Sequence, residues 1–234
     1  MKHALVTGST KGIGYAIAEK LIGRGYFVFL NYGHDDTATV PYTEDCCAII
    51  KADVSARGGI ETLTSAVQKK TNMLDCVVFN AGTTCRAPFG ELTYEDWQHV
   101  MDTNVNMPFF LAQNLSGSIA ENGSLVFISS ELSIRPHATS IPYGVSKAAV
   151  NMLALNLVKE LAPRGIRVNV ICPGFIDTEW QKEKPEWLRA KISEKIALRR
   201  FGTPEEVADA CMSLIDNSYI NGAIVTVDGG YDME

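Results

Sequence analysis

The sequence lacks the features that would indicate a metal site, a nucleic-acid partner or a membrane span. Its four histidines are scattered and show no metal-ligand spacing. Lys and Arg number 21 against 27 Asp and Glu and form no run, and the net charge of −6 argues against polyanionic partners. No apolar stretch approaches the roughly 18 residues of a membrane-spanning helix. We therefore expect no metal, no nucleic acid and no membrane.

The six cysteines also lack a pattern, since they form neither a disulfide framework nor a Cys-x-x-Cys pair. Free thiols packed as small apolar groups are typical of cytoplasmic proteins. The first residues, Met1-Lys2-His3, lead directly into an apolar strand pattern, so we expect no signal peptide. Both observations predict a cytoplasmic protein.

The chain alternates short apolar runs, which predict buried strands, with longer segments of helical periodicity. The predicted strands cover residues 4–7, 27–31, 48–51, 76–80, 124–129, 167–172 and 223–227. This alternation is typical of βαβ units that build a parallel sheet with helices on both faces. One connection, residues 34–45, is polar, contains Pro41 and predicts a loop or a shortened helix instead.

Nothing in the sequence divides the chain into separate domains. No repeat, low-complexity tract or Gly/Ser/Pro-rich linker interrupts it, and 234 residues with 46% hydrophobic content suffice for one large core. The predicted fold class is α/β: a single-domain Rossmann-type, doubly wound parallel sheet with helices on both faces, spanning residues 1–234.

A glycine-rich loop follows the first predicted strand. Residues 7–14 read TGSTKGIG and precede a helical pattern over residues 15–22. Glycines here permit a tight turn and let the backbone approach a pyrophosphate at the helix N-terminus. The spacing differs from the commoner Gly-x-Gly-x-x-Gly, and such a loop alone is weak evidence, but its place between strand and helix is the one the motif needs. We predict a dinucleotide site at this loop.

Tyr143 and Lys147 are four residues apart and so lie one turn apart on one helix face. A phenol holds its proton up to a pH of about 10, and a nearby ammonium lowers that pKa. Such a pair can donate and accept a proton near neutral pH, as general acid–base catalysis requires. The same spacing also occurs on many solvated surface helices, so the interpretation depends on the other motifs.

Helical periodicity also runs through residues 94–115, where Pro108 follows Asn104 by four positions. A proline has no N–H, and its ring crowds the carbonyl of the residue four before it. A kink at this point should leave the Asn104 carbonyl free to hold a water. The alternative is a polar helix residue beside a chance proline.

These motifs resemble, in identity and order, those of the classical short-chain dehydrogenase/reductase family, and the resemblance covers essentially the whole chain. Besides the motifs above, it rests on Asp53-Val54, Asn80-Ala81-Gly82, Ser130, Pro173-Gly174, Thr178 and the closing Val227-Asp228-Gly229-Gly230. Within the family, the nearest general resemblance is to 3-oxoacyl-[acyl-carrier-protein] reductases, chiefly from Gly165 onward.

The resemblance implies four catalytic residues, Asn104, Ser130, Tyr143 and Lys147. Tyr143 would give a proton to the carbonyl oxygen, or take it in the reverse direction, and Ser130 would hydrogen-bond the same oxygen. Ser130 follows a predicted strand at the edge where open α/β sheets bind ligands, although a strand-end serine can also be purely structural. Lys147 would lower the tyrosine pKa and bind the nicotinamide ribose, and the Asn104 carbonyl would reach the lysine through a water.

The resemblance also implies a nicotinamide dinucleotide and a set of residues that contact it. They are Gly8, Ser9, Thr10, Lys11, Gly12, Ile13, Gly14, Asn31, Tyr32, Asp53, Val54, Asn80, Ala81, Gly82, Tyr143, Lys147, Pro173, Gly174, Ile176 and Thr178. Residues 178–200 are charged, carry Trp180 and Trp187, and are interpreted as a lid over the substrate. A plain amphipathic surface helix is the alternative for this segment.

The predicted cofactor is NADP(H) rather than NAD(H). Enzymes of this type that use NAD place an acid just after the second strand, where a carboxylate grips the ribose 2′-hydroxyl and repels a 2′-phosphate. This chain has Asn31-Tyr32-Gly33 there, and Lys11 stands where similar NADP enzymes carry a basic residue. Asp35 and Asp36 lie close enough in sequence to keep NAD(H) as the alternative.

The helical segment after the catalytic tyrosine, residues 150–158, is apolar nearly all round. One sheet covers only one side of such a helix, and an apolar face left exposed on a monomer would be a liability. We therefore expect a homo-oligomer, and the resemblance implies a tetramer.

The predicted function is NADP(H)-dependent reduction of a ketone, 3-oxoacyl-type or similar, to a secondary alcohol by hydride transfer. A sugar, polyol or steroid dehydrogenase of the same family and a non-catalytic dinucleotide-sensing protein are the alternatives. Residues 113–123, where reductases of carrier-bound substrates commonly carry basic residues, contain no Lys or Arg and one acid. Arg164 and Arg167 could supply only part of such a patch. With the net charge of −6, this favours a small-molecule ketone over one bound to an acidic acyl carrier protein.

Overall fold

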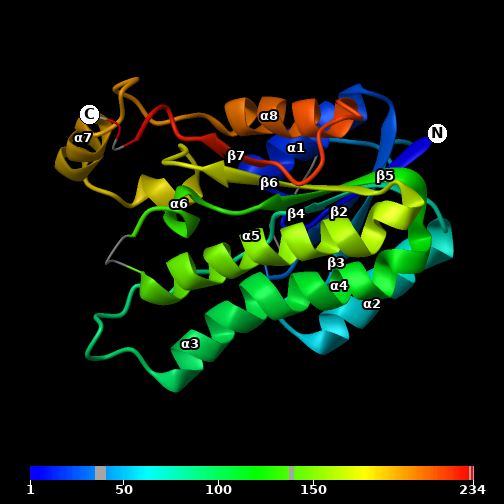
Figure 1. Ribbon diagram of the computed structural model, residues 1–234, viewed down its shortest axis with the longest axis horizontal. Helices are drawn as coiled ribbons and strands as arrows, with labels where there is room; N and C mark the ends of the chain where they lie inside the picture. The colour runs from blue at the N-terminus through cyan, green and yellow to red at the C-terminus, as the bar shows by residue number, and fades with distance from the viewer. Residues whose placement is uncertain (35–40, 137–139, 232, 234) are drawn as a thin grey trace.

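A seven-stranded parallel sheet forms the centre of the molecule (Figure 1). The computed structural model describes residues 1–34, 41–136, 140–231 and 233. The strands lie in the order β3-β2-β1-β4-β5-β6-β7, and each neighbouring pair is parallel. Their bounds are β1 (Lys2–Val6), β2 (Tyr26–Tyr32), β3 (Cys47–Lys51), β4 (Leu74–Phe79), β5 (Ile119–Ile128), β6 (Arg167–Pro173) and β7 (Ile224–Val227). The predicted doubly wound sheet is confirmed, although β5 begins earlier than residue 124.

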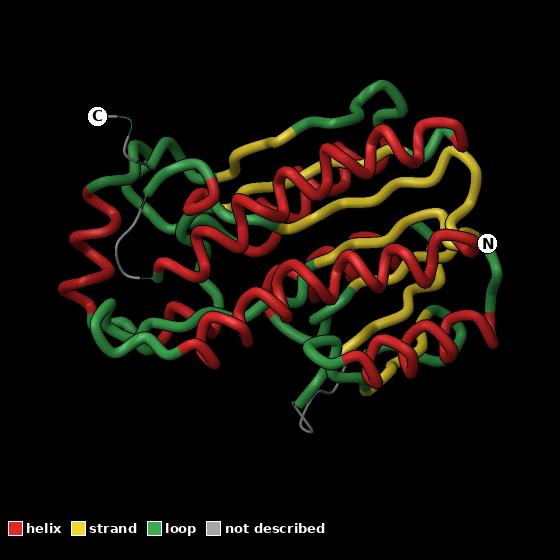
Figure 2. The backbone as a smooth tube through the Cα atoms, turned by 60° about the horizontal axis from the view of Figure 1, so that its bottom comes forward, coloured by secondary structure: helices red, strands yellow, loops and turns green. Residues whose placement is uncertain are grey.

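Helices cover both faces of this sheet, as Figures 1 and 2 show. One face carries α1 and α8, which pack together, and the other carries α2, α4 and α5. The helices are α1 (Gly12–Gly23), α2 (Arg57–Lys70), α3 (Tyr94–Met101), α4 (Met107–Leu115), α5 (Ile141–Leu161), α6 (Glu179–Lys182), α7 (Glu186–Glu194) and α8 (Pro204–Asp216). Within the described ranges, no helix is long and apolar enough to cross a membrane.

The strands read as continuous apolar runs because successive side chains enter two different cores. In β1, Val6 belongs to the core beneath α1 and α8, whereas its neighbour Leu5 belongs to the core beneath α2, α4 and α5. Phe79 and Phe127, on adjacent strands, stack in the second core with ring centroids 4.3 Å apart. Burial on both faces fixes the strand register, because a slip of one residue would exchange the two cores.

The predicted helix over residues 94–115 is interrupted near Asn104, where the sequence predicted a kink. A turn of π-helix, Asp102–Asn106, separates α3 from α4. Pro108 cannot donate a hydrogen bond to the carbonyl of Asn104 and crowds it, which disfavours the regular α-helical ladder here. The chain accommodates the proline with a wider turn, and Asn104 lies in the middle of that turn.

The segment after β6 is also broken up. It forms two short helices, α6 and α7, separated near Pro185, rather than one long amphipathic surface helix. A third small apolar cluster, made by Ile196, Phe201 and Tyr231, packs under this segment and ties it to the C-terminal end of the chain. Of the predicted loop 34–45, residues 35–40 lie outside the described residues, and residues 41–46 form a bend and a turn.

Gly58 and Gly59 stand together in the first turn of α2, but only one of them has room for a side chain. A Cβ at Gly59 would lie 1.8 Å from the backbone oxygen of Asp53, whereas a Cβ at Gly58 would meet nothing within 4 Å. We expect Gly59→Ala to lower the free energy of unfolding by about 1–3 kcal/mol, because backbone must move. Gly58→Ala is the matched control and should gain up to about 1 kcal/mol from helix propensity. Urea unfolding measures both, and equal stability of the two variants would contradict the clash.

Candidate active site

The carboxyl ends of the central strands open onto one pocket of about 420 Å³. It lies where the sheet order reverses between β1 and β4, the place at which open α/β sheets bind ligands. Much of the predicted site lines this pocket. These residues are Gly8, Lys11, Gly12, Ile13, Asn80, Ala81, Gly82, Ser130, Tyr143, Lys147, Pro173, Gly174 and Thr178. The parallel topology thus brings together motifs from five separate parts of the chain.

The glycine loop between β1 and α1 is packed tightly against the loop after β4. The Asn80 amide donates to the backbone oxygens of Thr7 and Gly8, at 3.0 and 2.9 Å. A Cβ at Gly14 would lie 2.3 Å from the Gly8 oxygen, and Gly8 itself has a φ of +60°. Only glycine satisfies both positions, so the loop can present its backbone to a ligand.

Tyr143, Lys147 and Ser130 meet in one wall of the pocket. Tyr143 stands in the first turn of α5, and the Lys147 Nζ lies 5.6 Å from the centroid of its ring. Ser130 follows β5 and hydrogen-bonds the Tyr143 phenol. Two hydroxyl groups are therefore side by side, an arrangement that can hydrogen-bond one oxygen of a ligand and exchange a proton with it.

The pKa values of this group differ from the sequence expectation. Burial raises the pKa of Tyr143 to about 12, and the hydrogen bond with Ser130 opposes this rise only in part. Burial also lowers the pKa of Lys147 to about 8, while its Nζ donates to the Ile128 carbonyl at 2.8 Å. Loss of hydration disfavours the charged form of both groups, so the net shift of the Tyr143 pKa is upward. The predicted stabilisation of the phenolate by Lys147 stays a prediction.

Asn104 lies behind this wall rather than in it, with only 1% of its surface exposed. Its Nδ2 donates to the Thr83 carbonyl and to the Ser146 Oγ, both at 2.9 Å, and its Oδ1 accepts from the Thr83 N–H at 2.8 Å. These bonds join the loop after β4 to α5, between Tyr143 and Lys147. The role predicted for its backbone carbonyl and a water stays a prediction.

The remaining predicted cofactor residues do not line the pocket. Asn31 is 1% exposed, and its Nδ2 donates to the Ala52 and Ile50 carbonyls at 2.9 and 3.3 Å, so its side chain is committed to β3. The others are Ser9, Thr10, Gly14, Tyr32, Asp53, Val54 and Ile176. Tyr32 is half-buried, Val54 packs against one core and Ile176 is buried in the other. These bonds turn the Asn31 amide towards β3, and its predicted contact with the cofactor stays a prediction.

Asp53 stands close to the end of β2. Its Oδ2 lies 3.0 Å from the His34 Nε2, and its Oδ1 accepts from the N–H and the Oγ of Ser55, at 2.9 and 2.7 Å. Burial tends to raise the pKa of Asp53, but the bonds from Ser55 and the nearby His34 outweigh it and hold that pKa below its usual range. These bonds hold an ionised carboxylate near the carboxyl ends of β2 and β3.

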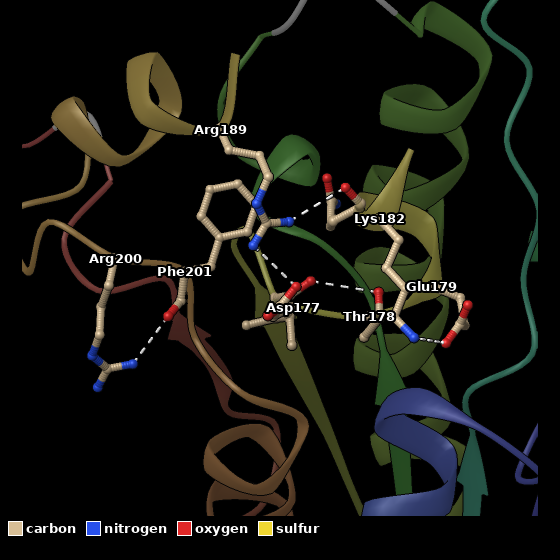
Figure 3. A network of polar contacts seen from close by, with 9 residues as sticks. Asp177, Thr178, Glu179, Lys182, Arg189, Arg200 and Phe201 are labelled. Atoms are coloured by element: carbon tan, nitrogen blue, oxygen red, sulfur yellow. Dashed lines mark hydrogen bonds and ion pairs between the residues drawn. The ribbon is translucent and has the colours of Figure 1, made fainter. Parts of the chain in front are cut away.

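The first part of the segment 178–200 lines the pocket and adds residues to which the sequence analysis gave no role in the site. Trp180 packs edge-on against Tyr143, with ring centroids 6.3 Å apart. Figure 3 shows the anchor of this segment: the Arg189 guanidinium lies 4.4 Å from the centre of the Phe201 ring, and its Nη2 is 3.1 Å from Asp177 Oδ1. The tryptophan was visible in the sequence, but its approach to Tyr143 depends on this tertiary anchor.

Comparison with known proteins identifies the group to which the chain belongs. The family described as "Enoyl-(Acyl carrier protein) reductase" matches residues 8–232. The chain is 38% identical to glucose 1-dehydrogenase 2 of Bacillus subtilis, over 98% of this chain and 94% of that protein. It is 35% identical to the 3-oxoacyl-[acyl-carrier-protein] reductase FabG of Aquifex aeolicus, over 98% and 96%. The chain belongs to the short-chain dehydrogenase/reductase family.

Solved structures of the family have the same fold. The Pseudomonas aeruginosa RhlG/NADP active-site complex superposes with a TM-score of 0.89 at 32% identity, over 99% of this chain and 96% of that one. As a short-chain dehydrogenase/reductase, the protein is an oxidoreductase of a family that binds a nicotinamide dinucleotide. The residues present fit such a group, because the backbone cradle at Gly8 and Gly14 excludes side chains and opens into the pocket.

Lys147 gives this short-chain dehydrogenase/reductase a measurable pH dependence of stability. Its pKa is about 8 in the folded state against 10.5 for an ordinary lysine, so between these values the unfolded chain binds more protons. The contribution of Lys147 to stability therefore rises with pH through this window and is least favourable below it. The free energy of unfolding of Lys147→Met, minus that of wild type, should therefore be largest below pH 8. This difference should fall by up to about 3 kcal/mol as the pH rises towards 10.5.

Urea unfolding between pH 7 and 9.5 checks this expectation. Lys159→Met, at an exposed position on the same helix, is the control and should follow the wild-type pH profile. Parallel profiles of wild type and Lys147→Met would contradict the lowered pKa.

Proposed function

We propose that the protein is an NADP(H)-dependent reductase that converts a small-molecule ketone to a secondary alcohol, with Tyr143 as the acid and base. The observation that carries this proposal is the meeting of Tyr143, Lys147 and Ser130 beside the glycine cradle, in one pocket. Asn104 is also present and buried next to them. A non-catalytic relative would have no need for all four residues together.

The reaction follows from these positions. The bound nicotinamide supplies the hydride. Ser130 donates a hydrogen bond to the carbonyl oxygen and polarises it, and Tyr143 gives its proton to that oxygen as negative charge develops there. The Lys147 ammonium stabilises the phenolate left behind. The buried position of Lys147 and the half-buried position of Tyr143 strengthen this interaction, because the charges are poorly screened.

Tyr143→Phe tests the assignment directly. A phenyl ring fills nearly the same space, so the fold and the affinity for cofactor should change little, while kcat falls by several orders of magnitude because the proton donor is gone. Tyr219→Phe, at a side chain that is 98% exposed, is the control and should keep full activity. A Tyr143→Phe rate above about a tenth of wild type, measured on a good ketone, would refute the role of Tyr143.

The choice of NADP(H) rests on charge near the adenosine end of the site. Residues 31–33, at the end of β2, carry no acid, and Lys11 of the glycine loop lines the pocket. The related RhlG structure is a complex with NADP. Asp53 is a carboxylate close to the β2 end, with its Oδ1 3.7 Å from where a Cβ on Gly33 would stand, and its Oδ2 lies 3.0 Å from His34. Lys11 in the glycine loop therefore favours a ribose 2′-phosphate, and residues 31–33 at the end of β2 offer no carboxylate that would repel it.

Lys11→Ala should weaken NADPH binding about tenfold, the equivalent of roughly 1.4 kcal/mol, and should leave NADH binding nearly unchanged. Lys20→Ala is the control, because Lys20 lies on α1, the helix that follows the glycine loop, and pairs with Asp209 at 2.6 Å, away from the pocket. Fluorescence titration of both cofactors checks the difference. Unchanged NADPH affinity, or wild-type kcat/KM values that are equal for NADPH and NADH, would overturn the choice of cofactor.

A free ketone is proposed in place of one carried on acyl carrier protein. Both arginines near the relevant surface are already engaged. Arg164 pairs with Glu121 at 2.7 Å, and Arg167 is 8% exposed and donates to the carbonyls of Leu214 and Ile215 at 2.6 and 2.7 Å. Neither is available to attract an acidic partner over a distance. A sugar or polyol dehydrogenase is the second candidate, favoured by the 38% identity to glucose 1-dehydrogenase 2.

We also propose that the protein works as a homo-oligomer, a tetramer, in the cytoplasm. The helices α4 and α5 leave large apolar side chains exposed on the side away from the sheet. These are Phe109, Phe110, Val145 and Met152, which are 36–60% exposed. A second copy would bury this face and remove it from water.

A further inference from the structure

Two cations in the pocket have no place in the reaction described above. Arg86 extends from the loop after β4, and Lys184 from the connection between α6 and α7, yet both line the same pocket as Tyr143. Neither side chain forms an ion pair or a hydrogen bond with the residues that the structure describes. Two like charges directed into one cavity repel each other, so their placement calls for a ligand of opposite charge.

The positions of both side chains are set by anchored backbone. The Ser140 Oγ donates to the Cys85 carbonyl at 2.6 Å and lies 2.8 Å from the Thr84 Oγ1, which holds the loop immediately before Arg86 against the start of α5. The Lys184 N–H donates to the Gln181 carbonyl at 3.1 Å, and Arg189 donates to the same carbonyl. Arg86 and Lys184 are therefore presented by a fixed frame rather than by loose surface loops.

The electrostatics agree with this geometry. Burial lowers the pKa of Lys184, and the charge of Arg86 lowers it further, so the two groups face each other closely enough to interact. The charge of Arg86 also acts to lower the pKa of Tyr143, which places it near the reacting phenol. An anion bound by Arg86 would therefore sit close to the carbonyl on which Tyr143 acts.

The charges along the pocket favour an anion over a neutral ligand. Its cations are Lys11, Arg86, Lys147 and Lys184, and its carboxylates are Glu131 and Glu179. The charge of Glu179 is paired with Lys182, which does not itself line the pocket (Figure 3). Lys11 and Lys147 act at the cofactor and at Tyr143, which leaves two cations for a substrate although the whole chain has a net charge of −6. A site that concentrates charge opposite in sign to the rest of the protein is typical of substrate selection.

We propose that Arg86 and Lys184 form a subsite for an anionic group of the substrate, so that the preferred ketone carries a carboxylate or a phosphate near its carbonyl. The inference rests on the proposed reductase function and names its substrate class. Arg86 binds the anion from the side of Tyr143, and Lys184 closes on it from the lid segment next to Trp180. Hydrogen bonds between charged groups in such a site are strong enough to decide between substrates.

The test separates binding from turnover. Calorimetry with oxidised NADP present, so that no ketone can be reduced, measures the affinity for 3-oxobutanoate, for 2-oxopropyl phosphate and for the neutral methyl 3-oxobutanoate. At least one anion should bind ten or more times more tightly than the ester, and the two anions distinguish carboxylate from phosphate. Arg86→Gln and Lys184→Gln should each remove most of this preference and leave ester and NADP affinity within about threefold of wild type.

Two controls guard the conclusion. Lys191→Gln alters an exposed lysine of α7 that does not line the pocket and should keep the anion preference, and Arg86→Lys should restore part of what Arg86→Gln removes. Equal affinity for anion and ester in wild type would overturn the subsite. A loss of NADP affinity in Arg86→Gln or Lys184→Gln, with anion preference intact, would also overturn it and assign these cations to the cofactor phosphates. If the anions bind as expected but no ketone is reduced with NADPH, the reductase proposal falls and the anion site stands.

Discussion

The close approach of two backbone loops at the centre of the sheet is the constraint on which the site depends. The Thr7 Oγ1 accepts from the N–H groups of Asn80 and Ala81, each at 3.0 Å, while the Asn80 amide donates back to the loop after β1. This reciprocal set locks the end of β1 to the end of β4, across the point where the sheet order reverses. It is possible only because Gly8 and Gly14 have no side chains. The absence of side chains at Gly8 and Gly14 therefore leaves the space in which a dinucleotide fits.

From this centre, the remaining groups are positioned by bonds that span loops and helices. Asn104 links the loop after β4 to α5, and the Ser129 Oγ donates to the Lys147 carbonyl at 3.1 Å and links the end of β5 to the same helix. The helix that carries Tyr143 and Lys147 is held from two neighbouring strand ends. Their relative position is therefore a property of the sheet edge, and a catalytic group held this way needs little reorganisation during reaction.

Burial then determines the electrostatic character of the pocket. Lys147 is buried and Tyr143 is half-buried, and this partial loss of hydration makes the phenol keep its proton and the amine release its own more readily. A charged group that enters this pocket interacts strongly with the charges of the protein there, whether it is a cofactor phosphate, a developing oxyanion or a substrate anion. A protein with a net charge of −6 can in this way present a locally basic pocket.

The amino-acid sequence by itself determined the alternation of strands and helices, the glycine loop, and the spacing of Tyr143 and Lys147. These depend on local rules: apolar periodicity, the conformational freedom of glycine, and the rise of a helix. Even the interruption near Asn104 follows from Pro108, although the sequence did not specify the π-helical turn that absorbs it.

Only the tertiary structure decided which way Asn31 points, how the pKa values of Tyr143 and Lys147 move, and that Arg86 and Lys184 meet in one pocket. The orientation of Asn31 is set by its pairing with β3, because register decides which face of the sheet a side chain enters. The pKa shifts and the pair of cations depend on which segments, distant in the chain, exclude water from one another. The burial of a side chain and its distance from other charges depend on segments from the whole fold, so a short stretch of sequence cannot predict them.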